Sequence, residues 1–73
     1  MSKVYKKITL VGTSPDGIGP AVKGAIKRAS ETLRHLDWFE LKEVRGRIEN
    51  GEVAEFQVVL EVGFRLEEGQ DAD

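Results

Sequence analysis

The only tryptophan of this 73-residue chain, Trp38, marks the position where the sequence could bind a ligand. It offers a large flat ring and one N–H donor. If Asn50 and Gly51 form the loop of a β-hairpin, Trp38 lies opposite Gly63, which leaves room above the backbone. Gln57 falls on the same face, and its amide can both donate and accept hydrogen bonds. This combination suits a planar heteroaromatic ligand, which needs a ring to stack on and an amide at its polar edge.

The same residues could also serve different roles. Trp38 could pack against another subunit, because tryptophan is enriched at interfaces as well as in pockets. Glu40 and Glu61 would face each other in this hairpin, and paired carboxylates can carry acid–base chemistry. Lys42 or Arg65 could neutralise them, however, and no nucleophile with a nearby base can be identified. The sequence therefore predicts a binding protein and not an enzyme.

Three further features are interpreted structurally. Arg45 and Arg47 flank Gly46 and could hold an anionic group, although solvated charges are the commoner role. Residues 17–19 lack the third glycine of a dinucleotide-binding turn and are interpreted as flexible capping sequence. His35 is expected at the end of a helix, where an imidazolium suits the helix dipole. A single histidine cannot form a metal site by itself.

The elements that position these residues follow from the spacing of apolar side chains. Residues 4–11 alternate weakly and are rich in β-branched types, which predicts a strand. A helix is predicted next, because apolar residues recur at spacings of three and four: Ile18, Ala21, Val22, Ala25, Ile26, Ala29, Leu33 and Leu36. Asp16 or Gly17 is the expected N-cap, because a start at Ser14 would leave Pro20 inside the helix.

The last two strands are predicted to form a hairpin. Every second residue from 56 to 66 is apolar, and residues 38–48 are the expected partner strand. Asn50 and Gly51 favour a type I′ turn between them. The resulting pairs are Phe39–Val62 and Leu41–Leu60 on the helix-covered face, and Glu40–Glu61, Lys42–Val59 and Val44–Gln57 on the other. A bulge near Arg45 and Gly46 could shift this register by one residue.

The predicted fold class is α+β, with the order β-α-β-β: a three-stranded antiparallel sheet with one helix packed on one face. We expect one domain over residues 1–73, with an ordered core at about 3–67 and a frayed acidic tail at 68–73. One helix cannot cover both faces of the sheet. Chains this short usually need an additional constraint, and the absence of cysteine leaves oligomerisation as the remaining one.

Composition limits the possible partners and location. The net charge is −2 with both signs interspersed, which argues against nucleic-acid binding. No apolar run approaches the length needed to span a bilayer, so no membrane association is expected. The first seven residues carry positive charge but no apolar segment of a signal peptide. Cytoplasmic localisation is therefore expected.

Four segments together resemble the bacterial dodecins: Val11-Gly12-Thr13-Ser14, Leu36-Asp37-Trp38-Phe39-Glu40, Val44-Arg45-Gly46 and the run from Phe56 to Glu67. The similarity covers residues 4–67 and keeps the spacing of these motifs. It implies a hollow homododecamer that stores flavin, either FMN or riboflavin. The flavins would be bound in pairs, stacked between tryptophans of symmetry-related subunits that quench their photochemistry.

The resemblance also implies roles for four residues. Trp38 would stack on the flavin ring, and Gln57 would hydrogen-bond its edge. Arg45 would lie near the flavin. Arg65 is associated with salt bridges in channels of the shell and with phosphate-bearing ligands such as coenzyme A. Two alternatives remain open: a structural oligomer without a small-molecule ligand, and a shell whose main ligand is coenzyme A.

Overall fold

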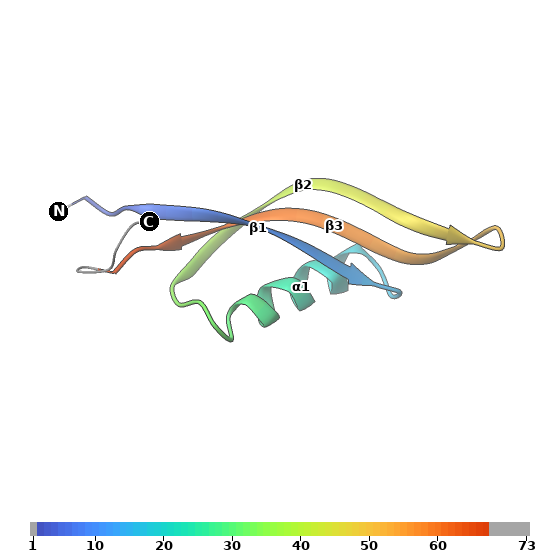
Figure 1. The fold of residues 1–73 in the computed structure, drawn as a ribbon, viewed down its shortest axis with the longest axis horizontal. Coiled ribbons are helices and arrows are strands. Elements are labelled where there is room, and N and C mark those ends of the chain that lie inside the picture. Colours follow the sequence, from blue (N-terminus) through green and yellow to red (C-terminus); the bar gives the residue numbers. More distant parts are fainter. Residues whose placement is uncertain (1, 68–73) are drawn as a thin grey trace.

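The computed structural model describes residues 2–67, which form β1 (Tyr5–Ser14), α1 (Ile18–Ala29), β2 (Leu36–Glu49) and β3 (Glu52–Arg65) (Figure 1). The strands make one antiparallel sheet in the order β1-β3-β2, so β3 lies at its centre. The predicted α+β class and the order β-α-β-β are confirmed. The predicted acidic tail, residues 68–73, lies outside the described residues.

The hairpin turn has the predicted geometry. Asn50 and Gly51 both have positive φ, at 53° and 79°, as a type I′ turn requires. This conformation matches the right-handed twist of the two long strands that the turn joins. The pairs from Trp38–Gly63 to Leu41–Leu60 also form as predicted.

Beyond Leu41 the predicted register is wrong. The extra residue of a bulge falls at Lys42 and not near Arg45, so the Lys42–Val59 and Val44–Gln57 pairs do not form. The observed partners beyond the bulge are Glu43–Val59, Val44–Val58 and Arg45–Gln57. The bulge places apolar Val44 opposite apolar Val58 and Arg45 opposite Gln57. Apolar side chains therefore stay on the helix side of the hairpin and polar side chains stay on the other side. A second irregularity between Arg47 and Ile48 restores the original register before the turn.

The helix begins where the sequence predicts and ends earlier. Gly17 is the N-cap with φ 142°, and the backbone N–H of Ala21 donates to its carbonyl oxygen over 3.2 Å. Pro20 is tolerated because it lies in the first turn, where backbone N–H groups have no partner within the helix.

The predicted continuation of the helix through Leu33 and Leu36 is wrong. Ser30 caps the helix, and its hydroxyl donates to the Lys27 carbonyl oxygen over 2.8 Å. Leu36 is the first residue of β2 and pairs with Phe64 of β3. The chain must therefore turn back before Leu36. Leu33 and Leu36 continue the apolar spacing of the helix, although the helix itself has already ended.

The helix packs on one side of the sheet against β1 and β3 (Figure 1). Ala21 of α1 and the β3 residues Val58, Leu60 and Val62 are buried between them. Gly12 of β1 allows this close approach, because a Cβ atom there would collide with the carbonyl oxygen of Ala21. The core is therefore narrow and follows the length of the central strand.

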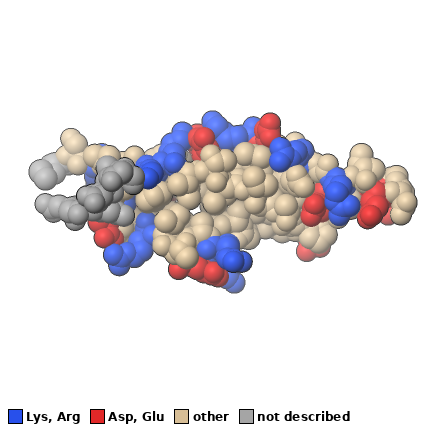
Figure 2. All heavy atoms as spheres, viewed as in Figure 1, with Lys and Arg blue, Asp and Glu red and all other residues tan. Residues whose placement is uncertain are grey.

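The helix does not cover β2. Phe39, Leu41 and Val44 point to the helix side of the sheet, yet they are 50%, 45% and 48% exposed. The predicted helix-covered face is thus covered over β3 and open over β2. Uncharged side chains occupy much of the surface seen in Figure 2, and charged groups gather toward its margins. We name Phe39, Leu41 and Val44 the apolar strip of β2.

Candidate ligand-binding face

The side of the sheet turned away from α1 carries most of the polar residues singled out by the sequence. We call it the open face. The strand pairings place these residues on it: Lys7 and Thr9 from β1, Trp38, Glu40, Glu43 and Arg45 from β2, and Gln57, Glu61 and Gly63 from β3. Three strands therefore contribute to one polar surface, with a single tryptophan near one end.

Trp38 lies across the central strand. Its six-membered ring rests over Gly63, where an added Cβ would collide with the ring carbons. The indole reaches Tyr5 of β1, with ring centroids 5.0 Å apart and an interplanar angle of 62°. This is an edge-to-face contact between aromatic rings. Trp38 remains 38% exposed, so the ring is supported from below and at one edge while part of it faces solvent.

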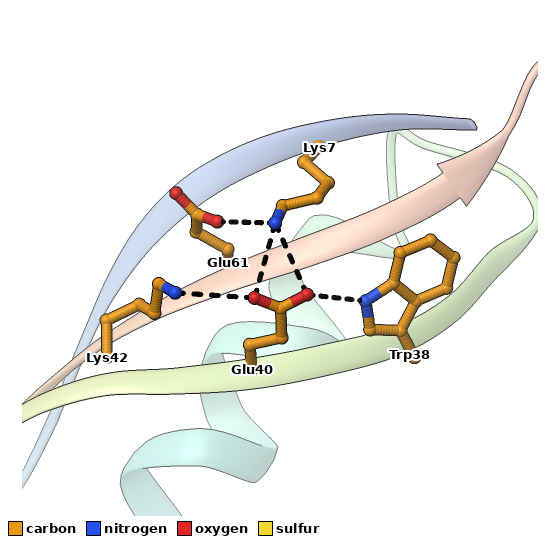
Figure 3. A network of polar contacts seen from close by, with 5 residues as sticks. All are labelled: Lys7, Trp38, Glu40, Lys42 and Glu61. Carbon is orange, nitrogen blue, oxygen red and sulfur yellow. Dashed lines mark hydrogen bonds and ion pairs between the residues drawn. The ribbon is translucent and has the colours of Figure 1, made fainter.

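A polar network surrounds the indole N–H group (Figure 3). Trp38 Nε1 donates to Glu40 Oε2 over 3.1 Å. Lys7 Nζ lies 3.2 Å from Glu40 Oε1 and 3.0 Å from Glu61 Oε1, so one ammonium bridges both carboxylates. Lys42 Nζ approaches Glu40 Oε1 at 3.4 Å. Five residues from three strands thus form one connected group.

Two members of this network, Glu40 and Lys7, have shifted pKa values. The hydrogen bond from the Trp38 indole, followed by that from Lys7, lowers the pKa of Glu40 below its ordinary 4.5. Glu61 and then Glu40 raise the pKa of Lys7 above its ordinary 10.5. A carboxylate held ionised in this way is a poor proton donor near neutral pH.

The predicted facing of Glu40 and Glu61 is confirmed, as is the neutralising role of Lys42. The expectation that Arg65 could neutralise them is not met, because Lys7 takes that place. Sequence reasoning missed Lys7. Its outward position in the first strand was visible, but nothing in the sequence aligned that strand with β3.

Arg45 and Gln57 form a second polar group on the open face. Arg45 Nε donates to Gln57 Oε1 over 2.9 Å, and Arg45 Nη1 donates to Glu43 Oε1 over 2.9 Å. Gln57 Nε2 in turn donates to Glu55 Oε1 over 3.3 Å, and Arg47 also contacts this carboxylate, at 3.5 Å. The amide of Gln57 is therefore held between an arginine and a glutamate.

The two groups are far apart within one chain. Gly63, below the tryptophan, is six residues from Gln57 on β3, which is about 20 Å at ~3.3 Å per residue. The indole also extends toward Tyr5, which pairs with Arg65, and so away from Gln57. One chain does not bring Trp38 and Gln57 onto a common ligand. A ligand that contacts both would lie between two copies of the chain.

Arg65 lies at the tryptophan end of the sheet, two residues beyond Gly63. Its Nη2 atom is 3.3 Å from His35 Nδ1, and His35 Nε2 is 2.8 Å from Glu67 Oε2. Arg34 also contacts Glu67, at 3.0 Å. His35, followed by Arg34, lowers the pKa of Glu67 below 4.5.

The predicted location of His35 at the end of the helix is wrong. It lies in the connection before β2 with φ 65°, six residues after α1 ends, and its imidazole contacts Glu67 and Arg65. Within residues 2–67 no group of histidine, aspartate and glutamate side chains is arranged to hold a metal ion. No helix in this range is long and apolar enough to cross a membrane.

One helix on a three-stranded sheet, an exposed tryptophan on the open face and an exposed apolar strip on β2 are features that fit a small ligand-binding protein of the self-assembling kind. The family model named Dodecin matches residues 4–67, and the chain belongs to the Dodecin family. The dodecin of Thermus thermophilus is 65% identical over 68 residues, which cover 93% of this chain and 99% of the relative.

Solved structures agree with this assignment. The dodecin from Streptomyces coelicolor is 58% identical, and the match covers 89% of this chain and 93% of that chain with a TM-score of 0.87. The crystal structure of the T. thermophilus dodecin W38F mutant matches with 62% identity and a TM-score of 0.87, over 90% of this chain and 98% of that chain. A T. thermophilus dodecin that carries a W38F substitution therefore has a fold closely similar to that of this chain.

Proposed function

We propose that the protein binds flavin, either FMN or riboflavin, by stacking the isoalloxazine ring on Trp38. The observation that carries this proposal is the position of the indole. It rests on Gly63, is contacted at its edge by Tyr5, and remains 38% exposed on the open face. A flat ring held in this way offers dispersion and desolvation to a second flat ring.

We propose that the complete site lies between symmetry-related subunits of a homododecamer. The separation of Trp38 from Arg45 and Gln57 supports a site shared between copies, in which one chain supplies the ring and another the polar group. At a two-fold axis the same patch meets itself, so two tryptophans face each other and can enclose a pair of flavins. The apolar strip of β2 supports the assembly that this requires.

The proposed role is storage and sequestration of flavin without catalysis. On excitation, one electron passes from the indole to the isoalloxazine and then returns to the indole, so the excited state decays without net chemistry. A flavin enclosed between aromatic rings is shielded from substrates. The lowered pKa of Glu40 makes its carboxylate a weaker general base, which supports a binding role over acid–base chemistry. We expect the protein to act in the cytoplasm.

A phosphate-bearing ligand such as coenzyme A is the second candidate. Arg34, His35 and Arg65 gather at the end of β3, where Arg34 and His35 contact Glu67 and Arg65 contacts His35. An assembly with no small-molecule ligand is the structural alternative, in which Trp38 makes only subunit contacts. Both alternatives predict that flavin binding is weak or absent.

A fluorescence titration separates these possibilities. Ligand-free oligomer is added to FMN or riboflavin, and flavin emission is followed. We expect strong, saturable quenching at about one flavin per chain, because an electron-rich indole in contact with the ring shortens its excited state. Unchanged emission from a well-formed oligomer would remove the flavin proposal, and direct binding of coenzyme A would then be tested in its place.

A further inference from the structure

We propose that Glu40 is a positioning residue for flavin binding: its carboxylate accepts the indole N–H of Trp38 and fixes the direction in which the ring lies on the open face. This inference rests on the proposed function and extends it to a residue that does not itself stack on the ligand. Lys7 holds this carboxylate in place from β1, the opposite edge strand of the sheet (Figure 3).

The floor below the ring cannot fix its direction. Gly63 has no side chain, so it allows the indole to lie flat but provides no lateral stop. Tyr5 contacts the ring from the β1 side only. The N–H group is the only polar group of the indole. The position of its hydrogen-bond acceptor therefore decides how the indole ring is oriented on the sheet. Glu40, two residues further along β2, supplies that acceptor at 3.1 Å.

The position of Glu40 is in turn determined by cations from two strands. Lys7 of β1 approaches both of its carboxylate oxygens, at 3.2 and 3.3 Å, and also pairs with Glu61 of β3. Lys42 approaches the same carboxylate from β2 at 3.4 Å. A hydrogen bond to an ionised acceptor is shorter and stronger than one between neutral groups.

This network is better suited to orientation than to stability. The side chains of Lys7 and Glu40 are 44% and 37% exposed, and exposed ion pairs contribute little to folding. A fixed ring, in contrast, lowers the entropy that a ligand must remove on binding. A carboxylate on the N–H also raises the electron density of the indole, which favours contact with an electron-poor isoalloxazine.

Two substitutions at Glu40 test the inference. Glu40→Leu removes the acceptor, and Glu40→Gln keeps an acceptor oxygen but removes its charge. Glu49→Gln is the matched control, because it removes the same charge from the same strand, where Glu49 pairs with Arg47 at the hairpin end. Assembly of each variant is checked by size-exclusion chromatography.

Two readouts are measured: near-ultraviolet circular dichroism without ligand, and the dissociation constant for riboflavin by equilibrium dialysis. The chain has one tryptophan and one tyrosine, so the tryptophan band reports on Trp38. We expect Glu40→Leu to reduce this band and to weaken riboflavin binding roughly tenfold. Glu40→Gln should have a smaller effect on both, and Glu49→Gln should match the parent.

The outcomes separate this inference from the proposed function. If the parent binds riboflavin, and both Glu40 variants keep the parent's tryptophan band and affinity, the positioning role is wrong and the flavin site stands. If the parent binds no riboflavin, the proposed function fails, and the tryptophan band alone decides whether Glu40 orients the ring. If Glu40→Leu does not assemble, Glu40→Ala takes its place, because it also removes the acceptor of the indole N–H. A parent-like tryptophan band and affinity in that variant would overturn the inference.

Discussion

At the scale of single residues, the tryptophan site depends on the absence of a side chain at Gly63. Trp38 can lie across β3 only because Gly63 has no side chain. The same absence lets the ring reach Tyr5 on the far strand, where the edge-to-face contact limits its motion. A small residue and a large one therefore act as one unit, and changing either should change the surface offered to a ligand.

Gly63→Ala tests this dependence. The new methyl group would collide with the indole carbons, so the ring must tilt away from the sheet. We expect riboflavin affinity to fall roughly tenfold, within the range that one stacking contact contributes. Equilibrium dialysis measures the affinity, and size-exclusion chromatography verifies assembly. Parent-like affinity in an intact Gly63→Ala oligomer would show that the ring does not need this floor.

The ionisation of Glu40 gives a pH dependence with a defined sign. The pKa of Glu40 is lowered in the folded protein. The stabilising interaction of its ionised carboxylate is therefore fully present above the ordinary pKa of 4.5 and is lost as pH falls through the lowered pKa. We expect the tryptophan dichroism band to stay constant from neutral pH to about 4.5 and to decrease below it. Glu40→Gln should lack this transition. A transition of equal size in Glu40→Gln would assign it to another group.

At the scale of elements, local sequence patterns determine the hairpin turn and its first strand pairs, but they do not determine the bulge or the end of the helix. The type I′ turn at Asn50 and Gly51 and the pairing of Trp38 with Gly63 follow from residue types within the hairpin. The bulge at Lys42 does not, because either register is possible until the apolar face of β3 selects Val44 as a partner for Val58. The early end of the helix depends on a different pair of the same two strands, Leu36 with Phe64.

The site was predictable to a similar degree. Trp38 and Gln57 stand out by residue type and by their face of the predicted hairpin. Lys7 does not, because the pairing of β1 with β3 joins segments about fifty residues apart with no tight turn to fix their register. The hairpin pattern places Trp38 and Gln57 on the same face of the sheet. It does not show that they lie far apart along that face, which becomes clear only from the distance along β3.

The contact between the helix and the sheet yields a paired prediction. In Gly12→Ala the new methyl group meets the Ala21 carbonyl oxygen, so the helix must shift outward, and we expect a loss of roughly 1–3 kcal/mol in the free energy of unfolding. Gly24→Ala adds the same group on the helix with nothing within 4 Å, and should instead stabilise by about 0.5–1 kcal/mol. Chemical denaturation measures both. Equal effects would contradict the close approach at Gly12.

At the scale of the whole molecule, one subunit is too extended to bury its own apolar surface. Its radius of gyration is 14.8 Å, against about 11 Å for a compact chain of this length. Among residues 2–67, more large apolar side chains are exposed than buried, including the apolar strip of β2. The hairpin projects beyond the end of the helix (Figure 1). Such a surface needs further copies of the chain to cover it.

Val44→Glu tests the link between assembly and binding. A charge in the apolar strip should oppose burial against another copy, so we expect a smaller species by size-exclusion chromatography with light scattering. Riboflavin binding should be lost with it, because Trp38 and Gln57 are too far apart in one chain. Lys23→Glu, on the exposed side of α1, is the control. A dissociated Val44→Glu chain that binds riboflavin like the parent would contradict a site shared between copies.

Stacking of flavin on Trp38 is tested most directly by the riboflavin affinity of Trp38→Ala, compared with the parent and with Trp38→Phe. Equilibrium dialysis with detection by absorbance is required, because removing the indole also removes the quencher and would distort an emission signal. We predict that Trp38→Ala weakens binding by at least about tenfold, whereas Trp38→Phe keeps a flat ring and part of the affinity. Parent-like affinity in an assembled Trp38→Ala oligomer would contradict a site built on this ring.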